Sequence, residues 1–445
     1  MTIRSASPRR VTRGASLLLI TLCAYFIGSV PAHAADTQDD FFNDAALQDA
    51  HLNLNAKDWE TLKANDDENT YYPADLSWSN VTVRNVGIRS RGKGTRNGIK
   101  PGLRVDINRY LTNLLFLGMK AIILDNAYSD STLIRESVTM KMFARMNVPA
   151  PREAHIRLFV NNEYVGVYIA VEPLDRTFVT RIWGLQEGAT EFGGYLYEYE
   201  HISDYNMEYL GPDLEPYAPM FRPQTHETDS LASLFQPIEE MIRTINEATD
   251  QDFAAAVGQY LDLQQFMKYL AIETFMGDFD GFVGYNAVNN FYLYRFAQNG
   301  RFQLIPWDKD AALQGVDLPV TSRMDANVLV HRAMDDRELR QVFIDTLAQC
   351  TSIANEPAAP DDPRGWLERE IDRQSAQIAD AVAADPVYPF SYQQFAQDVS
   401  VEIDFGRNRP VYVACEVSRL ADPGAPEDAC ASIFNPTTLK SLAVR

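Results

Sequence analysis

The amino-acid sequence predicts an α+β fold in which a strand-rich lobe precedes a helix-rich lobe, and three observations lead to this prediction. Between residues 80 and 173 most apolar residues alternate with polar ones, as they do in half-buried strands. Beyond residue 174 the apolar residues recur at the spacing of helices that pack on a core. The change falls at Glu172-Pro173, and because proline disfavours the continuation of a strand, we expect a hinge there.

The strand-rich lobe is expected to contain single strands, a helix and a hairpin. The single strands are predicted at 81–89, 103–107 and 121–124. A helix fits Ser131–Met146, capped by Asp130 or by its own first residue. Asn161-Asn162 separates the apolar runs 155–160 and 164–171, which is typical of a β-hairpin.

The helix-rich lobe is expected to extend from residue 174 to residue 445. Helices are predicted at about 174–183, 228–247, 250–258, 262–277 and 364–384. A polar, acidic stretch with several prolines, at about 198–230, is expected to be a surface insertion. Residues 315–445 contain no motif that indicates a particular chemistry.

The first 34 residues have the pattern of a secretory signal. Four arginines and no acid precede an apolar run from Ser16 to Val30, and Ala32-His33-Ala34 fits a cleavage site. Because the run is short for a membrane anchor, we expect cleavage after about Ala34 and a secreted or periplasmic protein without a membrane span. Residues 35–79 are then expected to be an N-terminal extension that precedes the strand-rich lobe.

Charge and cysteine content limit the partners of the mature chain. The signal contains four of the 40 basic residues and none of the 61 acidic ones, so its removal leaves 36 against 61, a net charge of −25. A surface this acidic excludes nucleic acid, or anionic lipid over the whole surface, as a partner. Cys350, Cys415 and Cys430 remain, and in an oxidising compartment they allow one disulfide and one thiol, with the pairing left open.

A basic island lies between residues 84 and 109, where Asp106 is the only acid. Its members are Arg84, Arg89, Arg91, Lys93, Arg96, Lys100, Arg104 and Arg109. The part from Arg91 to Gly98 is rich in glycine, so backbone N–H groups could turn towards an anion. The island predicts either a cradle for a polyphosphate or a solvated hairpin face that pairs with acids elsewhere, and it matches neither common phosphate-loop motif.

A second hairpin is predicted at 291–296 and 301–306, with its turn centred near residue 299. This register would bring Asn290 beside Asp308 and place Asp310 one step further. One or two carboxylates with an amide oxygen suit Mg²⁺ and leave room for phosphate oxygens. The alternative is an ordinary hairpin end, because Asp and Asn are common in turns.

Further candidates could reach the same site. Asp280, or Asp278 beside it, lies on a glycine-bounded loop just upstream and could act as a base. Lys100 could position phosphates if Glu136 of the predicted helix held it, although both could equally be surface residues. Glu172 could serve at the hinge or pair with a nearby arginine. Zinc-enzyme and serine-hydrolase functions have little support, because neither H-E-x-x-H nor G-x-S-x-G occurs.

Six runs of residues resemble the CotH kinase family. They are Arg89-Ser-Arg91-Gly92, Lys100-Pro-Gly-Leu-Arg104-Val, Leu133-Ile-Arg135-Glu136, Gly166-Val-Tyr168-Ile-Ala-Val-Glu172, Asn289-Asn290-Phe-Tyr292-Leu-Tyr294 and Ile305-Pro306-Trp307-Asp308-Lys-Asp310. The resemblance covers about 80–315, and the run from Asn290 to Asp310 is its most specific part. It implies a two-lobed protein-kinase-like fold that uses ATP with Mg²⁺ or Mn²⁺.

The resemblance also implies roles for individual residues. Lys100 looks like the phosphate-binding lysine, and Asp280 looks like the aspartate that orients the acceptor hydroxyl, which makes both catalytic. Asn290 and Asp308 look like the metal ligands. From the residues themselves, Arg91, Glu136 and Glu172 are candidates for nucleotide binding beside Lys100.

The sequence departs from the family at two positions that bear on activity. Glu198 follows a Leu-Tyr pair where many members carry a lysine, and Lys309 replaces the more usual apolar residue between the two aspartates. The function predicted is an exported atypical kinase that transfers a phosphoryl group from a nucleotide to a Ser/Thr hydroxyl of an unidentified protein. The alternative is a non-catalytic kinase-like protein of the envelope or cell surface, with a structural or adhesive role.

Overall fold

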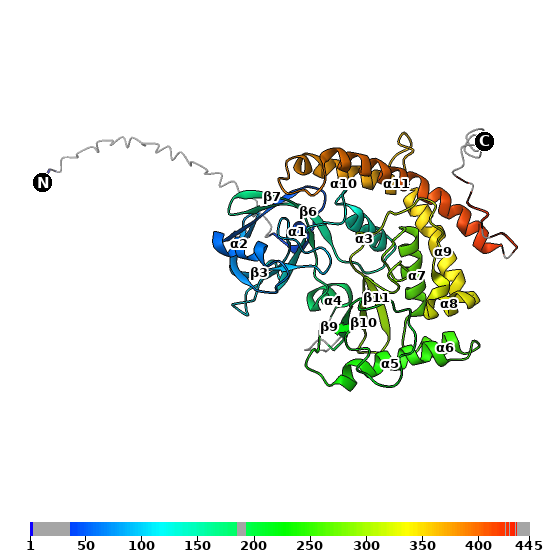
Figure 1. Ribbon diagram of the computed structural model, residues 1–445. Coiled ribbons are helices and arrows are strands. Elements are labelled where there is room, and N and C mark those ends of the chain that lie inside the picture. Colours follow the sequence, from blue (N-terminus) through cyan, green and yellow to red (C-terminus); the bar gives the residue numbers. More distant parts are fainter. Residues whose placement is uncertain (3–35, 185–192, 423, 427, 432, 434–445) are drawn as a thin grey trace. The chain divides into compact units, whose positions relative to one another are not determined.

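The computed structural model describes residues 1–2, 36–184, 193–422, 424–426, 428–431 and 433 (Figure 1). The chain divides into two compact units, Met1–Ala35 and Asp36–Arg445, and the helices and strands of the described residues belong to the second. The expected signal, 1–34, lies outside the described residues except for its first two. In the described part of the chain, no helix combines the length and apolar character needed to cross a membrane.

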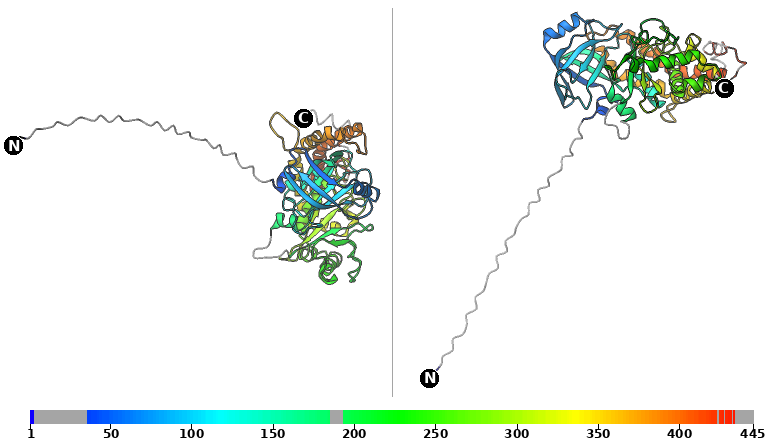
Figure 2. Two further views of the ribbon diagram at one scale, coloured as in Figure 1. Left: turned by 90° about the vertical axis from the view of Figure 1, so that its left-hand side faces the viewer. Right: turned by 90° about the horizontal axis from the view of Figure 1, so that it is seen from below.

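Seven strands close into a barrel, which forms the strand-rich lobe (Figure 2). They are β1 (Gln48–Leu54), β2 (Tyr72–Trp78), β3 (Val81–Arg91), β4 (Gly102–Asp106), β5 (Ala121–Asp125), β6 (Glu153–Val160) and β7 (Glu163–Val171). The order around the barrel is β1-β2-β3-β4-β5-β7-β6, and the parallel pair β1 and β6 closes the ring. Fully buried apolar side chains such as Leu52, Val86 and Leu158 form its core.

The barrel begins earlier in the chain than we expected. Strands β1 and β2 precede residue 80 and pair with β6 and β3, so residues 35–79 contribute to the sheet and are not an extension. The short helices α1 (Gln38–Phe41) and α2 (Ala56–Ala64) accompany these strands. Sequence reasoning missed β1 because Asp49, His51 and Asn53 give its outer face the polarity of a loop.

The hairpin predicted at 155–171 is confirmed as β6 and β7. Its two turn asparagines have φ angles of 51° and 67°, which suit the turns that match strand twist. The predicted helix is present as α3 (Arg135–Arg145) and begins four residues later than expected. Leu133, with a φ of 58°, is not helical, and Asp130 accepts a hydrogen bond from the N–H of Arg135 across this irregular turn.

A second sheet with four strands lies in the helix-rich lobe. It has the order β11-β10-β8-β9 and consists of β8 (Tyr195–Tyr199), β9 (Phe221–Pro223), β10 (Phe291–Arg295) and β11 (Phe302–Pro306). The stretch 198–230, expected to be a surface insertion, contributes part of β8 and all of β9. Tyr205, Tyr217 and Met220 of the same stretch are buried in the main core, so it is not an appendage.

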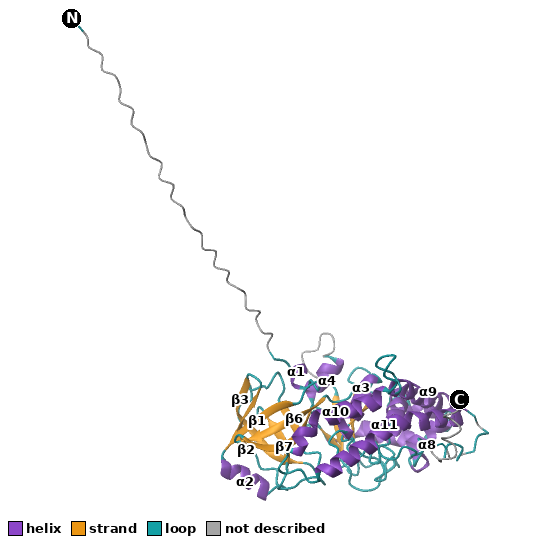
Figure 3. Cartoon of the chain, turned by 90° about the horizontal axis from the view of Figure 1, so that it is seen from above, coloured by secondary structure: helices purple, strands orange, loops and turns teal. Residues whose placement is uncertain are grey.

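Helices make up most of the remaining lobe (Figure 3). They are α4 (Arg176–Trp183), α5 (Leu231–Glu247), α6 (Phe253–Val257), α7 (Leu263–Phe275), α8 (Val328–Asp335), α9 (Arg337–Ala354), α10 (Trp366–Ala383) and α11 (Tyr392–Ala421), with a 3₁₀ turn at Met324–Ala326. The five predicted helices are confirmed as α4, α5, α6, α7 and α10, each within three residues at either end. Helices α8, α9 and α11 were not predicted. The barrel strands lie at one end of the unit, and α8, α9 and most of α11 lie towards the other, as expected for an α+β protein.

Helices α10 and α11 contact both α3 and the barrel, and we call this pair the helical strap. Arg135 Nε of α3 donates to Glu402 Oε1 of α11 (2.7 Å). The loop between α10 and α11 carries Asp385, whose Oδ2 accepts hydrogen bonds from Lys100 Nζ and Val167 N of the barrel, both at 3.0 Å. The side chains of Lys100 and Asp385 are almost completely buried, so an ion pair that is shielded from water joins the helical strap to the barrel.

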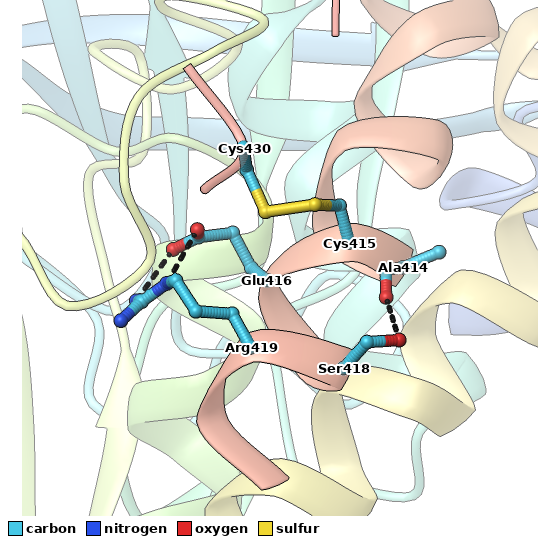
Figure 4. The surroundings of a disulfide bond; sticks show 6 residues. All are labelled: Ala414, Cys415, Glu416, Ser418, Arg419 and Cys430. Carbon is cyan, nitrogen blue, oxygen red and sulfur yellow. Dashed lines mark hydrogen bonds and ion pairs between the residues drawn. A yellow bond between two sulfur atoms is a disulfide. The ribbon is translucent and has the colours of Figure 1, made fainter. Parts of the chain in front are cut away.

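A disulfide joins Cys415, near the end of α11, to Cys430 (Figure 4). Beside it, Glu416 accepts two hydrogen bonds from Arg419, both at 2.9 Å. Cys350 is buried and keeps a free thiol. Among the described residues there are thus one disulfide and one free thiol, and the pairing that the sequence left open is Cys415 with Cys430.

Candidate functional site

One cavity of about 710 Å³, which we call the polar cavity, is lined by several of the charged residues that the sequence singled out. It is lined by the glycine-rich loop that follows β3 and by the segments on either side of the β10–β11 hairpin. Arg91, Asp280, Asn290 and Asp308 all line it, together with Asp125 at the end of β5. The structure thus brings four of the predicted site residues to one place.

The β10–β11 hairpin delivers Asn290 and Asp308 to the polar cavity. Phe291 pairs with Pro306, so the predicted register, with Asn290 opposite Asp308, was wrong by one residue. The turn consists of the four residues 297–300, closed by a hydrogen bond across its ends (2.9 Å), and is not centred on residue 299. Both residues nevertheless line the cavity, and each has a positive φ (56° and 52°), which is incompatible with continued pairing of the strands.

Asp280 is held by three amide groups. Its Oδ1 accepts a hydrogen bond from Asn286 Nδ2 (2.8 Å), and its Oδ2 accepts from Asn289 Nδ2 (3.0 Å) and Asn290 Nδ2 (3.1 Å). Because Asn290 uses its amide nitrogen in this contact, its amide oxygen is left for another ligand. The acid and the amide expected at the site are therefore in direct contact.

Asp278, the alternative to Asp280, is engaged elsewhere. Its Oδ2 forms an ion pair with Lys309 Nζ (2.9 Å), and its Oδ1 accepts a hydrogen bond from Asp280 N (3.0 Å). Lys309 is 0% exposed and also binds Glu273 (2.5 Å). Two buried carboxylates thus neutralise the lysine that departs from the family pattern, and Asp280 is the acid that remains open to the cavity.

Asp308 and Asp310 have no protein partner in the part of the chain that the structure describes. Both line the polar cavity, yet no described residue forms a hydrogen bond or an ion pair with either carboxylate. Desolvation by the cavity walls and the nearby Asp125 raise the pKa of Asp308 to about 6. Desolvation and the charge of Asp308 raise the pKa of Asp310. Neighbouring carboxylates in this state would be stabilised by a cation.

The residues of the polar cavity fit a divalent cation that is shared with a phosphate ligand. Mg²⁺ is usually bound by one or two carboxylates together with water and phosphate oxygens, and Asp308 with the amide oxygen of Asn290 provides such a partial set. Among the described residues, no three His, Cys, Asp or Glu side chains are placed to hold a metal by themselves. The missing ligands would therefore have to come from the phosphate and from water.

Half of the basic island lines the polar cavity, namely Arg89, Arg91, Lys93 and Arg96. Arg91 donates to Asp125 Oδ2 (2.6 Å), and Lys93 Nζ donates to the carbonyl oxygen of His201, another residue of the cavity lining (2.6 Å). Arg96 donates to the backbone carbonyls of residues 66–68 and so supports the loop itself. Arg91 and Lys93 are consequently the cations best placed to meet a ligand.

Lys100 and Glu172 lie away from the polar cavity. Lys100 pairs with Asp385 of the helical strap, so the expected contact between Lys100 and Glu136 is not formed. Glu172 binds Arg152 (2.8 Å) and Arg181 (2.5 Å) at the boundary between the lobes. Both side chains are buried and satisfied by protein groups, which leaves neither available to a nucleotide in this structure.

Glu136 is buried beside Glu153, a second carboxyl, and not beside a lysine. Desolvation and the charge of Glu153 raise the pKa of Glu136 well above its ordinary value. Desolvation and the charge of Asp125 do the same for Glu153. Asp308 contributes to both shifts, so the pair lies close to the polar cavity without lining it. A carboxyl pair of this kind holds a proton, which makes it a poor ligand for phosphate.

Sequence reasoning missed Asp125, Asn286 and Asn289. Asp125 is the last residue of β5, which was predicted at 121–124, and a carboxylate at the end of a buried strand is a signal that could have been used. Asn286 and Asn289 lie within four residues of Asn290, and their relation to Asp280 depends on a turn that the spacing alone does not define.

Comparisons with known proteins show which proteins this chain is similar to. The family model described as CotH kinase protein matches residues 88–413. The inner spore coat protein H of Bacillus subtilis (strain 168) is 24% identical over 392 residues, which cover 85% of this chain and 99% of that protein. A crystal structure of the Helicobacter pylori proinflammatory kinase CtkA matches 70% of this chain and 95% of that chain, with a TM-score of 0.25 and 8% identity.

Proposed function

The chain belongs to the CotH kinase family, and from this premise we propose that it transfers the γ-phosphoryl group of ATP to a Ser or Thr hydroxyl of a protein. The observation that carries the proposal is the polar cavity. Two carboxylates in it, Asp308 and Asp310, have no protein partner among the described residues. The cavity also contains Asp280, which is held by three side-chain amides, and it is lined by the basic loop that follows β3. Phosphoryl transfer depends mainly on positioning and charge neutralisation, which these groups could supply.

Each group has a role in this proposal. Asp280 orients the acceptor hydroxyl and accepts its proton, because its carboxylate is fixed by amide donors and lies in the cavity. Arg91 and Lys93 bind phosphate oxygens, and Arg91 takes the part that the sequence suggested for Lys100. Asn290 and Asp308 would hold Mg²⁺ or Mn²⁺, which would supply charge neutralisation at the phosphates when bound. The bond between the γ-phosphorus and its bridging oxygen breaks and ADP leaves, while the acceptor oxygen takes the phosphoryl group and Asp280 takes the proton of the hydroxyl.

The place of action and the acceptor are also proposals. The signal pattern of residues 1–34 supports export, and the disulfide between Cys415 and Cys430 is consistent with an oxidising compartment. The curated relative is named as an inner spore coat protein, which supports an acceptor that is itself a protein of an outer layer. We therefore propose an exported kinase whose acceptor is a neighbouring extracytoplasmic protein.

A thermal-shift titration of the purified protein with ATP, in the presence and absence of Mn²⁺ or Mg²⁺, tests the site. A ligand that binds only the folded state raises stability by about 2.7 kcal/mol at a hundred times its dissociation constant. We expect a metal-dependent rise in Tm that is lost in Asp308→Asn. Asp280→Asn should keep binding and lose turnover. A wild-type protein without any response would refute the proposed function.

A non-catalytic role is favoured by one observation, the carboxylate of Glu198 on the cavity wall. Many family members carry a lysine there, and here Glu198 binds Arg222 and so removes positive charge from the surroundings of the phosphates. A non-catalytic protein would bind a metal–nucleotide complex but transfer no phosphoryl group to any protein in an envelope extract. Incubation with γ-labelled ATP and envelope extract, with Asp280→Asn as the control, separates binding from transfer.

A further inference from the structure

Lys309 is a fully buried lysine between the two partnerless aspartates. Its side chain is 0% exposed, and Nζ lies 2.5 Å from Glu273 Oε1 and 2.9 Å from Asp278 Oδ2. Those carboxylate side chains are themselves at most 1% exposed. Burial of an ammonium and two carboxylates is costly, and an apolar residue in this place would avoid the cost. The chain therefore maintains a charged contact where packing alone would favour an apolar one.

The two carboxylates belong to different parts of the site. Glu273 lies in the last turn of α7, and besides Lys309 it accepts hydrogen bonds from Tyr269 Oη (3.0 Å) and from Phe282 N (2.7 Å). Asp278 begins the loop that carries Asp280. Lys309 thus connects the end of α7, this loop and the segment that follows β11.

The connection continues to the residues of the polar cavity on both sides. On one side, Asp278 Oδ1 accepts from Asp280 N (3.0 Å), and the Asp280 carboxylate accepts from Asn290 Nδ2 (3.1 Å). On the other side, Lys309 is covalently adjacent to Asp308. A Cβ atom on Gly281 would lie 2.3 Å from Glu273 Cδ, so the Glu273 carboxyl packs directly against the backbone of the loop that carries Asp280. Displacement of Lys309 would consequently move Asp280 and Asp308 relative to each other.

We propose that Lys309 is a positioning residue that holds the metal-binding Asp308 in register with the acceptor-orienting Asp280. The inference rests on the proposed function for the roles of these two aspartates. Lys309 itself touches neither substrate nor metal in this proposal, because it is sealed from the cavity by the residues around it. A lysine suits this task, since one ammonium can bind carboxylates from two separate segments at once.

The experiment compares three forms of the protein with the wild type. Lys309→Met alone would leave two buried carboxylates without a cation and is expected to melt at a lower temperature. The triple variant Lys309→Met, Glu273→Gln and Asp278→Asn removes all three charges with little change in volume and should melt close to the wild type. The matched control, Glu416→Gln with Arg419→Met, removes another largely buried ion pair, in α11 beside the disulfide.

Two readouts separate positioning from a merely structural role. Hydrogen exchange should be at least tenfold faster for backbone amides of residues 280–290 in the triple variant, and unchanged in the control. The dissociation constant for Mn²⁺–ATP and the turnover number should each worsen at least tenfold, with the KM for the acceptor nearly unchanged. Wild-type exchange rates in a triple variant of wild-type stability would overturn the proposal. If the wild type itself fails to bind Mn²⁺–ATP, the proposed function is wrong, and the exchange rates still decide whether Lys309 couples the two segments.

Discussion

Removal of the Arg409 guanidinium should destabilise the end of α7 and the loop that leads to Asp280. The Arg409 side chain is 0% exposed and lies in α11. It donates to the carbonyl oxygens of Thr274, Phe275, Val316 and Leu318 at 2.6–3.0 Å. The last carbonyls of a helix have no partner within the helix, so this side chain closes α7 from outside.

For Arg409→Met we expect the free energy of unfolding to fall by about 3 kcal/mol. A buried carbonyl without a donor costs roughly 1–3 kcal/mol, and Phe275 O is left in that state. Thr274 O keeps the bond from Gly277 N (3.2 Å), and the contacts to Val316 and Leu318 are partly buried, so water can replace them. The shorter methionine side chain leaves a gap that adds roughly 1–2 kcal/mol.

Urea unfolding followed by far-ultraviolet circular dichroism measures this loss. Arg409→Lys is the control, because it keeps the charge but cannot reach four carbonyls from one nitrogen, and it should lose about half as much. Burial lowers the pKa of Arg409 to about 10, so the guanidinium is charged at pH 7 and the comparison is made between two cations. An Arg409→Met variant within measurement error of the wild type would refute the closing role.

Three other predictions concern the helical strap and the disulfide. Desolvation raises the pKa of Glu402 from 4.5 to about 7. Between these pH values the folded state therefore binds more protons than the unfolded state. The free energy of unfolding should fall by at most roughly 3 kcal/mol as the pH rises from 4.5 to 7. Glu402→Gln should abolish this fall in urea titrations at pH 5 and pH 8, and an unchanged profile would assign the dependence to other groups. The double variant Cys415→Ala, Cys430→Ala should lose at most about 3 kcal/mol of the free energy of unfolding in thermal melts, because the disulfide closes a loop of 15 residues. A double variant as stable as the oxidised wild type would contradict this. Gly406→Ala places a Cβ of α11 2.9 Å from Glu368 Cα of α10, so we expect calorimetry to show a loss of about 1–3 kcal/mol in the free energy of unfolding. A variant that melts at the temperature of the wild type would mean that α10 and α11 can move apart without cost.

The sequence was sufficient where local patterns decide the structure. The β6–β7 hairpin has an asparagine pair at its turn, and five helices have a periodic apolar face, so both kinds of element were predicted correctly. The grouping of Asn290, Asp308 and Asp280 also followed from a hairpin and a short upstream loop. The one-residue error in register arose because the turn has an even number of residues, which composition alone does not distinguish from an odd number.

The sequence was insufficient where the partner is distant in the chain. Lys100 meets Asp385, 285 residues further on, and no local spacing could indicate that α10 and α11 return to the barrel. Glu136 meets Glu153, and a pair of like charges is a contact that charge complementarity would reject. In both cases the actual partner depends on the closure of the barrel and on helices without a recognisable motif.

The helical strap has a consequence for the kinetics of ligand exchange. The barrel and the helices are joined by the buried contact between Lys100 and Asp385, and Glu172 at the expected hinge is fixed by two arginines. Rotation of one lobe against the other would have to break these contacts. The contact of exposed Lys93 with the carbonyl of His201 is far easier to break. We therefore expect the residence time of a nucleotide to be set by the opening of the short loop that carries Lys93, on the timescale of loop motion. It should depend little on denaturant concentrations that loosen the contacts between the lobes.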